Sequence, residues 1–181
     1  MRYSGIIYDD TAAAPGLCLS FYTQGCPIHC PGCHNPGTWD PDGGHEFTGA
    51  TMDSILSGIN KNGIERSFAI LGGEPFAPYN HFLVAMIVQT VRQNYPKIPI
   101  WIWSGYDAKE LMTMTHLPHV KLILQNCNVL VTGPFVEAKR DITLPYRGSS
   151  NQEVWEIDHE KNIWYNKFTK EIREVKYNGG Q

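Results

Sequence analysis

Residues 17–35 have the sequence LCLSFYTQGCPIHCPGCHN, and this stretch decides the fold. Residues 17–23 are apolar and partly alternating and are soon followed by a glycine, which predicts a strand that runs into a loop. The loop carries Cys26, Cys30 and Cys33 with C-x3-C-x2-C spacing. Thiolates ligate iron–sulfur clusters, and a cubane cluster has four irons to ligate. Three local thiolates therefore leave one iron open to bind a small molecule, as catalytic metal sites do.

The same cysteines are also compatible with a structural zinc site. His34 or His29 could complete a tetrahedral set of nitrogen and sulfur ligands. Zinc sites usually pair ligands from two separated knuckles, however, and the chain has no second cysteine pair. Iron–sulfur is thus favoured while zinc stays open. The other two cysteines, Cys18 and Cys127, are expected to be buried apolar thiols.

Length and composition point to one globular domain with a substantial core. The chain has 181 residues, of which 42% are hydrophobic and 18% charged, which excludes a disordered chain. A net charge of -3 argues against nucleic-acid binding. No apolar run approaches the ~20 residues of a membrane span, and the N-terminus lacks the pattern of a signal peptide. We therefore expect a cytoplasmic protein, in a compartment where thiols stay reduced.

Strands and helices alternate after the cysteine loop, beyond an irregular segment at residues 34–48. The predicted strands are residues 67–71, 98–103 and 128–131, and the predicted helices are residues 51–62, 82–94 and 108–114. Such alternation predicts βαβ units, hence an α/β fold with a parallel sheet.

Polar or glycine-rich motifs follow three of these strands: Gly72-Gly73-Glu74-Pro75, Ser104-Gly105-Tyr106 and Thr132-Gly133-Pro134. In parallel α/β folds the functional groups gather at the carboxyl ends of the strands. We therefore expect the cysteine loop and these three motifs to converge at one edge of the sheet. The simpler interpretations are a tight turn for the glycines, a polar strand end for Ser104, and packing for the tryptophans of residues 98–103.

The C-terminal part departs from this alternation. Residues 153–158 and 162–168 are predicted to form two short strands joined by a polar turn. We accordingly expect a core domain at residues 1–152 and a C-terminal extension at residues 153–181. The extension either forms a peripheral hairpin that covers the core or modulates the docking of a partner.

Several motifs together resemble the radical S-adenosylmethionine superfamily. Within it, the finer resemblance is to the activating proteins of anaerobic (class III) ribonucleoside-triphosphate reductases. The matching segments are the cysteine run and GGEP at residues 72–75, then CPGCHN at 30–35, TW at 38–39, WIWSGY at 101–106, NVLV at 128–131 and YRGSSNQ at 146–152. The cysteine motif alone is moderately specific, whereas these motifs in this order are highly specific.

The resemblance implies a cofactor pair. Cys26, Cys30 and Cys33 would hold three irons of a [4Fe-4S] cluster, and S-adenosylmethionine would chelate the open fourth iron. An electron from the cluster would then give a 5'-deoxyadenosyl radical, so no acid–base side chain is required. The implied contacts of S-adenosylmethionine are Gly72 and Gly73 at its amino group, Glu74 as a loop cap or charge, Gly32, Cys33 and His34 along the adenosine, and Ser104 near the methionine or ribose.

The resemblance also implies a partner and a fold. The radical would be passed to a glycine Cα of an anaerobic ribonucleotide reductase, with flavodoxin or ferredoxin as electron donor and with no nucleic acid or membrane involved. The implied fold is an incomplete parallel (β/α) barrel with a short C-terminal extension. Thr132 stands where the family typically has Asp, and Cys18 where Arg is common. The alternatives are an activase of the pyruvate formate-lyase type, a small nucleoside-modifying enzyme, and a non-enzymatic zinc module or ferredoxin-like carrier.

Overall fold

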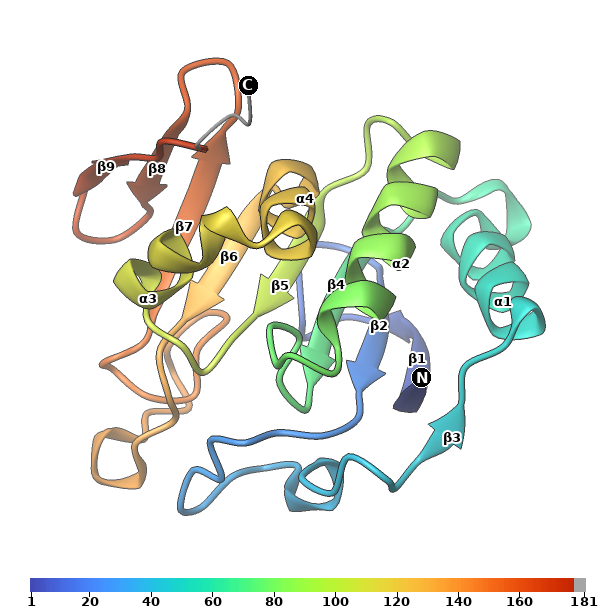
Figure 1. The fold of residues 1–181 in the computed structure, drawn as a ribbon, viewed down its shortest axis with the longest axis horizontal. Helices are drawn as coiled ribbons and strands as arrows, with labels where there is room; N and C mark the ends of the chain where they lie inside the picture. Colours follow the sequence, from blue (N-terminus) through green and yellow to red (C-terminus); the bar gives the residue numbers. More distant parts are fainter. Residues whose placement is uncertain (178–181) are drawn as a thin grey trace.

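Four parallel strands form the centre of the molecule, which the computed structural model describes for residues 1–177. They are β2 (Cys18–Thr23), β4 (Ser67–Gly72), β5 (Ile100–Trp103) and β6 (Val129–Thr132), paired in that order. Each coincides with a strand predicted from the sequence to within one or two residues. All four end at the same edge of the sheet, along which the cysteine loop runs (Figure 1). The predicted parallel core is therefore confirmed.

Four helices cover one face of this sheet (Figure 1). They are α1 (Gly49–Ile59), α2 (His81–Asn94), α3 (Ala108–Thr113) and α4 (Pro118–Asn126), with short 3-10 turns at Pro36–Thr38, Lys61–Gly63, Met114–His116 and Glu137–Lys139. The sequence predicted the first three helices but not α4, which is short and begins with a proline. None of the helices in residues 1–177 has both the length and the apolar character that a membrane crossing requires.

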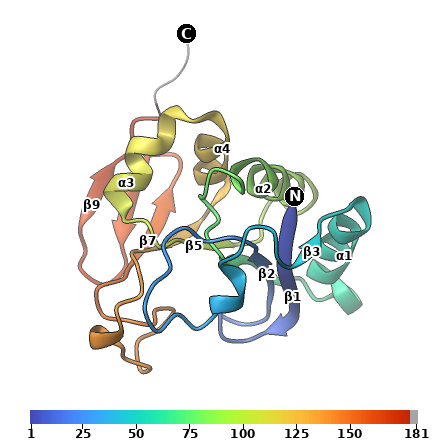
Figure 2. The same ribbon diagram turned by 60° about the horizontal axis from the view of Figure 1, so that its bottom comes forward.

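Antiparallel strands extend the sheet on both sides (Figure 2). On one side lie β1 (Arg2–Asp10) and β3 (His45–Glu46), and on the other β7 (Glu153–Asp158), β8 (Ile163–Asn166) and β9 (Ile172–Glu174). The strand order is β3-β1-β2-β4-β5-β6-β7-β8-β9, with three parallel and five antiparallel pairings. The α/β class is confirmed. The incomplete parallel barrel stays a prediction, since the sheet as a whole is mixed and mostly antiparallel.

The C-terminal strands belong to the same sheet and core as the rest. β7 pairs with β6, and the side chains of Trp155 and Trp164, from β7 and β8, are fully buried in the main hydrophobic cluster. The two strands predicted for this region are confirmed, and β9 adds a third. The boundary at residue 152 stays a prediction about domain organisation.

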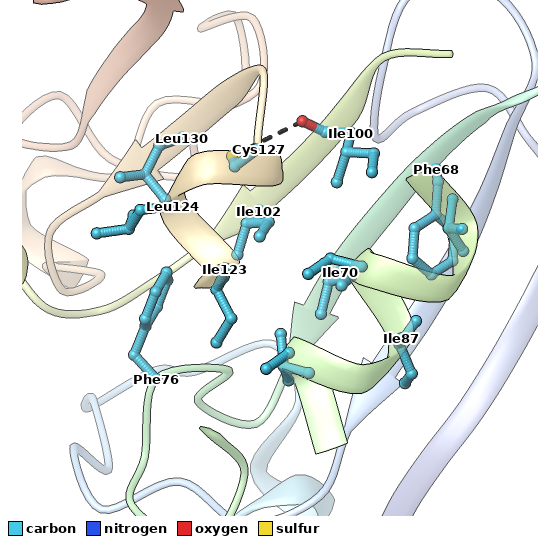
Figure 3. Packing of buried hydrophobic residues seen from close by; sticks show 14 of the residues in the cluster. Phe68, Ile70, Phe76, Ile87, Ile100, Ile102, Ile123, Leu124, Cys127 and Leu130 are labelled. Atoms are coloured by element: carbon cyan, nitrogen blue, oxygen red, sulfur yellow. Dashed lines mark hydrogen bonds between the residues drawn. The ribbon is translucent and has the colours of Figure 1, made fainter. Parts of the chain in front are cut away.

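Hydrophobic side chains fill both faces of the central strands. The larger cluster lies between the sheet and the helices and includes Phe68, Ile70, Ile87, Ile123 and Leu130 (Figure 3). A smaller cluster on the opposite face includes Ala13, Cys18, Trp101 and Val131. Strands buried on both faces are typical of a parallel sheet. Cys18 and Cys127 are fully buried, as predicted. These two cysteines therefore belong to the hydrophobic core and are separate from the three cysteines of the loop.

Candidate functional site

The loops that follow the four parallel strands meet in one pocket, which we call the cysteine pocket. Its lining comes from the cysteine loop, from the ends of β4, β5 and β6, and from the segment before β7. The lining residues are Cys26, Ile28, Cys30, Cys33, Gly72, Gly73, Glu74, Trp103, Ser104, Gly105, Gly133, Phe135 and Gln152. The convergence predicted from the strand order is thus present, and it brings together three of the five cysteines.

The cysteine loop is held by backbone hydrogen bonds and one aromatic contact. The N–H of Cys33 donates to the carbonyl of Cys30 at 3.1 Å, and the N–H of Cys26 donates to the carbonyl of Trp39 at 3.1 Å. His29 has a left-handed φ of 51°, and its ring stacks on Trp39 with centroids 4.6 Å apart. The loop therefore has a defined shape that leaves its three thiols partly exposed to the pocket.

The chemistry of the donor set suits a cluster with one open iron. Burial raises the pKa of the Cys26 and Cys30 thiols, which favours their protonated form until a metal binds and displaces the proton. Within residues 1–177, no three His, Cys, Asp or Glu side chains gather round a single ion position. In a four-iron cluster each cysteine binds a different iron, so the three thiols need not converge on one point. Cys127 is committed elsewhere, with its Sγ 3.0 Å from the carbonyl oxygen of Val129.

The two glycines at the end of β4, Gly72 and Gly73, allow the loops of β4 and β2 to touch. The N–H of Gly73 donates to the carbonyl of Thr23 at 2.9 Å, and the N–H of Glu74 donates to the carbonyl of Gly25 at 2.8 Å. A Cβ at Gly73 would lie 2.4 Å from the Gly25 carbonyl oxygen. Gly72 has a φ of 95°, which favours glycine. The motif therefore forms a tight turn and also allows its backbone to approach that of the cysteine loop closely.

Glu74 links the ends of β4 and β5. Its side chain is fully buried and accepts hydrogen bonds from the Ser104 hydroxyl at 2.9 Å, the Gly105 N–H at 2.7 Å and the Phe76 N–H at 2.9 Å. Burial raises the pKa of Glu74 to about 7, although these donors favour its charged form. Ser104 is likewise buried. The hydrogen bond between these two side chains therefore helps to fix the shape of the pocket wall.

Asn80 is a residue of this site that the sequence analysis missed. It immediately precedes α2, and its Nδ2 donates to the carbonyl of Gln24 at 3.1 Å and to that of Glu74 at 2.9 Å. A side chain in this position is ordinarily predicted to cap its own helix, yet it makes no such bond here. Only its place a few residues after GGEP could have signalled a role in joining the two loops.

Residues 147–152 hold the end of β6. Gln152 Oε1 accepts from the N–H groups of Gly148 at 2.9 Å and Ser149 at 3.2 Å, and its Nε2 donates to the carbonyl of Gly133 at 3.0 Å. One side chain thus shapes its own loop and fixes the neighbouring strand end. Of the residues in this segment, Gln152 lines the cysteine pocket.

Two of the predicted site residues lie beside the pocket and do not line it. The His34 ring meets the edge of Phe135, with centroids 5.3 Å apart, and it lines an adjoining groove together with Trp103. Trp103 also lines the cysteine pocket, so the two hollows are neighbours. Gly32 has a φ of 74° and lies close to the Glu137 carboxylate.

Comparison with known proteins gives consistent matches over most of the chain. The sequence model of the family described as 4Fe-4S single cluster domain matches residues 12–155. The chain is 37% identical over 155 residues to an anaerobic ribonucleoside-triphosphate reductase-activating protein of Escherichia coli (strain K12), covering 85% of this chain and 97% of that protein. Proteins of the same name from Vibrio cholerae and Enterobacteria phage T4 are 32% identical (85% of this chain, 97% of the relative) and 29% identical (86% and 94%).

Proposed function

The chain belongs to the family of anaerobic ribonucleoside-triphosphate reductase-activating proteins, and from this premise we propose a radical S-adenosylmethionine mechanism. It is an activating protein for anaerobic ribonucleotide reductase with a 4Fe-4S domain. In our proposal it installs a glycyl radical on that reductase by means of a [4Fe-4S] cluster and S-adenosylmethionine. The observation that carries the proposal is the cysteine pocket, where three thiols face a glycine loop and to which residues 1–177 contribute no fourth cysteine.

Cys26, Cys30 and Cys33 would each hold one iron of the cluster. Their thiols line one pocket, whereas Cys18 and Cys127 are fully buried among apolar side chains. Neither of these two can supply a fourth thiolate without unpacking the core. The fourth iron would thus be left for S-adenosylmethionine.

S-adenosylmethionine would lie against the backbone of Gly72 and Gly73 and near Ser104, all of which line the pocket. Gly32 and His34 would lie along the adenosine, since His34 borders the adjoining groove. When bound, the two cofactors would supply the one-electron chemistry that removes a hydrogen atom from a glycine Cα of the partner. No side chain of the pocket is needed as an acid or a base.

The protein's own contribution is to fix the cofactors relative to each other. The approach of Gly73 to Gly25 sets the distance between the glycine loop and the cysteine loop. The Glu74–Ser104 hydrogen bond sets the neighbouring wall, and Gln152 sets the end of β6. A site held by a second layer of hydrogen bonds keeps its groups in productive positions.

The partner is an anaerobic ribonucleotide reductase, and the electron donor would be a flavodoxin or ferredoxin. We expect the protein to work in the cytoplasm, because a partly exposed set of thiols needs a reducing compartment. We also propose that the parallel strands β2, β4, β5 and β6 are the core of an incomplete (β/α) barrel. Its open rim would admit a segment of the partner.

The decisive experiment detects the product radical. Reduced protein, S-adenosylmethionine and a candidate anaerobic reductase are mixed without oxygen, and the glycyl radical is followed by electron paramagnetic resonance. The reconstituted protein should be brown and hold about four irons, and Cys30→Ala should abolish the radical, whereas Cys127→Ser should leave it. A persistent radical in Cys30→Ala would contradict the assignment of that ligand.

The other candidate functions are not favoured. The relatives quoted above carry the name of the anaerobic reductase activator, which does not support a pyruvate formate-lyase activase. Colourless protein that binds zinc and shows no spectral response to S-adenosylmethionine would instead support a non-enzymatic metal module.

A further inference from the structure

On the face of the sheet opposite to the helices, an open groove lies beside the cysteine pocket. We call it the aromatic groove. Its apolar wall consists of five partly buried side chains, those of Tyr22, Leu71, Trp103, Leu144 and Tyr146. Three of them, Leu71, Trp103 and Tyr146, pack against the smaller hydrophobic cluster. Trp103 lines both the groove and the cysteine pocket, so one side chain borders the two hollows.

Tyr146 is held in this groove with a backbone conformation that an aromatic residue rarely adopts. Its φ is 64°, and such a strained conformation persists only where the surroundings enforce it, which is often at a functional site. The indole N–H of Trp103 donates to the Tyr146 carbonyl at 2.9 Å. The Tyr146 ring lies against that of Trp101, with centroids 4.8 Å apart, and Trp101 stacks on Trp103 at 5.8 Å. The three rings therefore form one wall of fixed shape.

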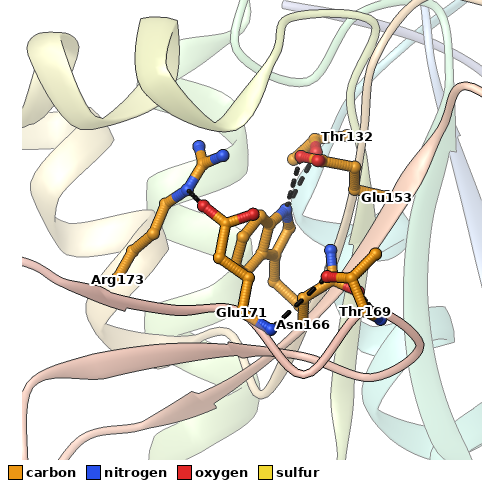
Figure 4. Close-up of polar contacts among 7 residues, drawn as sticks. Thr132, Glu153, Asn166, Thr169, Glu171 and Arg173 are labelled. Carbon is orange, nitrogen blue, oxygen red and sulfur yellow. Dashed lines mark hydrogen bonds and ion pairs between the residues drawn. The ribbon is translucent and has the colours of Figure 1, made fainter.

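A second side of the groove depends on the C-terminal extension. Arg147 lines the groove, and its guanidinium lies over the Phe168 ring at 4.2 Å while Nη1 donates to the Gln152 carbonyl at 3.1 Å. Phe168 belongs to the turn between β8 and β9. In this turn Asn166 Oδ1 accepts from the N–H of Thr169 at 2.9 Å (Figure 4) and from that of Phe168 at 3.1 Å. The groove is thus preformed, which lowers the cost of binding a ligand in it.

The polar groups of the groove do not select a charged ligand. Asp10 and Arg147 contribute one charge of each sign, and Asp10 already accepts from the Ser20 hydroxyl at 2.6 Å. The hydroxyls of Tyr22 and Tyr146 make no hydrogen bond in the part of the chain that the structure describes, so they can still donate or accept one. An uncharged ligand that offers N–H and C=O groups suits this lining. A peptide backbone has this chemistry.

We propose that the aromatic groove holds the backbone segment of the partner reductase that carries the reacting glycine, with Tyr146 as a positioning residue. The inference rests on the proposed function, in which the glycine Cα must reach the cofactors of the cysteine pocket. His34, which that proposal places along the adenosine, also lines the groove, so a segment in the groove would lie beside the adenosine.

The rings of the groove would set the distance over which the hydrogen atom moves. One hydrogen atom passes from the glycine Cα to the 5' carbon of the adenosyl group, so one C–H bond breaks, one forms, and the unpaired electron stays on the glycine. Because glycine has no side chain, its backbone can lie directly against the wall that Tyr146 and Trp103 form. Such a transfer depends steeply on the position of the reacting atoms.

The test variant is Tyr146→Asn. Asparagine adopts a left-handed φ more readily than most residues, and the carbonyl that accepts from Trp103 remains, so the ring is lost while the loop keeps its shape. Tyr146→Phe keeps the ring and loses only the hydroxyl, and Leu144→Asn alters the same wall at a second position. The matched control is Tyr8→Asn, at a tyrosine that is 41% exposed and lies beside the start of β2, away from the groove.

The readout is the number of glycyl radicals on the reductase per molecule of 5'-deoxyadenosine formed. We expect Tyr146→Asn to lower this ratio at least tenfold, because a misplaced glycine no longer receives the radical. Leu144→Asn should change the ratio in the same direction, Tyr146→Phe should lower it less than Tyr146→Asn, and Tyr8→Asn should match wild type. Affinity for S-adenosylmethionine, and its cleavage with a chemical reductant and no reductase, should be unchanged in all four variants.

A wild-type ratio in Tyr146→Asn and Leu144→Asn would overturn the inference, and Leu144→Asn alone decides if Tyr146→Asn does not fold. Weaker binding of S-adenosylmethionine that accounts for the whole loss would overturn it in favour of the adenosine as occupant. Altered self-association with a wild-type ratio would overturn it in favour of a second copy of this chain. A wild-type protein that cleaves no S-adenosylmethionine would instead refute the proposed function.

Discussion

At the scale of single residues, the shape of the cysteine pocket depends on the absence of a side chain at Gly73 and on the hydrogen bonds of the Glu74 carboxylate. Gly73 has no Cβ, and the Gly25 carbonyl occupies the space where one would be. Glu74 has no charged partner in its hydrogen-bond set, which consists of one hydroxyl and two N–H groups. Both residues are candidate site residues in the sequence because they belong to the GGEP motif. Their structural roles, however, come from contacts with residues that are distant in the sequence.

Gly73→Ala should impair the binding of S-adenosylmethionine without removing the cluster. The new Cβ would lie 2.4 Å from the Gly25 carbonyl oxygen, a backbone atom that cannot turn away, so the two loops must separate. We expect at least a tenfold loss of affinity for S-adenosylmethionine, measured by equilibrium binding, with the iron content retained. Gly37→Ala is the control because a Cβ there meets nothing within 4 Å. Unchanged affinity in Gly73→Ala would show that the loop spacing is not critical.

Glu74→Gln should remove a pH dependence of stability from the cluster-free protein. Burial raises the pKa of Glu74 from 4.5 to about 7, so between these values the folded state keeps a proton that the unfolded state loses. The free energy of unfolding contributed by Glu74 is then fully present below pH 4.5 and falls as the pH rises to about 7, by about 3 kcal/mol.

Denaturant unfolding of both proteins from pH 4.5 to 8 checks this prediction. The quantity to compare is the slope of the unfolding free energy with pH, because the amide also alters the hydrogen bonds of the site. If Glu74→Gln and wild type show parallel curves, Glu74 is ionised throughout and its raised pKa is wrong.

At the scale of elements, the alternating core was predictable and the supports of its loops were not. The strands of the parallel core are predictable because each is a short apolar run that is soon followed by glycine or serine. β1 (Arg2–Asp10) contains a glycine and ends in two aspartates, and its pairing with β2 is irregular. α4 has only Val120, Ile123 and Leu124 as a buried stripe. Asn80 and Gln152 also bond to backbone groups far from them in sequence, the carbonyls of Gln24 and Gly133, for which sequence patterns carry no signal.

Gln152→Ala should loosen the loop of residues 147–152. Its amide group joins Gly148, Ser149 and Gly133, and buried groups that lose their hydrogen-bond partner cost ~1–3 kcal/mol. We expect a loss of stability of this size in denaturant unfolding, with faster amide hydrogen exchange at residues 148 and 149. Gln125→Ala, on the exposed side of α4, is the control. Unaltered exchange in Gln152→Ala would mean that the loop is held by its other contacts.

At the scale of the whole molecule, the extension is bound into the core that carries the site. The pattern of residues 153–181 breaks the alternation of strands and helices, which predicts a separate extension. Antiparallel pairing with β6 depends on contacts that the local sequence does not encode, yet it continues the sheet to β9. The positions of β6 and the C-terminal strands are thereby linked, so these strands support the end of β6 that borders the cysteine pocket.

Trp164→Ala should therefore destabilise the entire chain and not only its end. The indole is fully buried in the main cluster, and replacing a buried aromatic side chain by alanine costs ~3–5 kcal/mol. For a chain of this size, that corresponds to a drop in Tm of roughly 10 °C, in one transition if the extension and the core unfold together. Ile172→Ala on β9, whose side chain is 59% exposed, should change Tm little. Two separate transitions in Trp164→Ala, followed by circular dichroism and tryptophan fluorescence, would instead favour an extension that folds apart from residues 1–152.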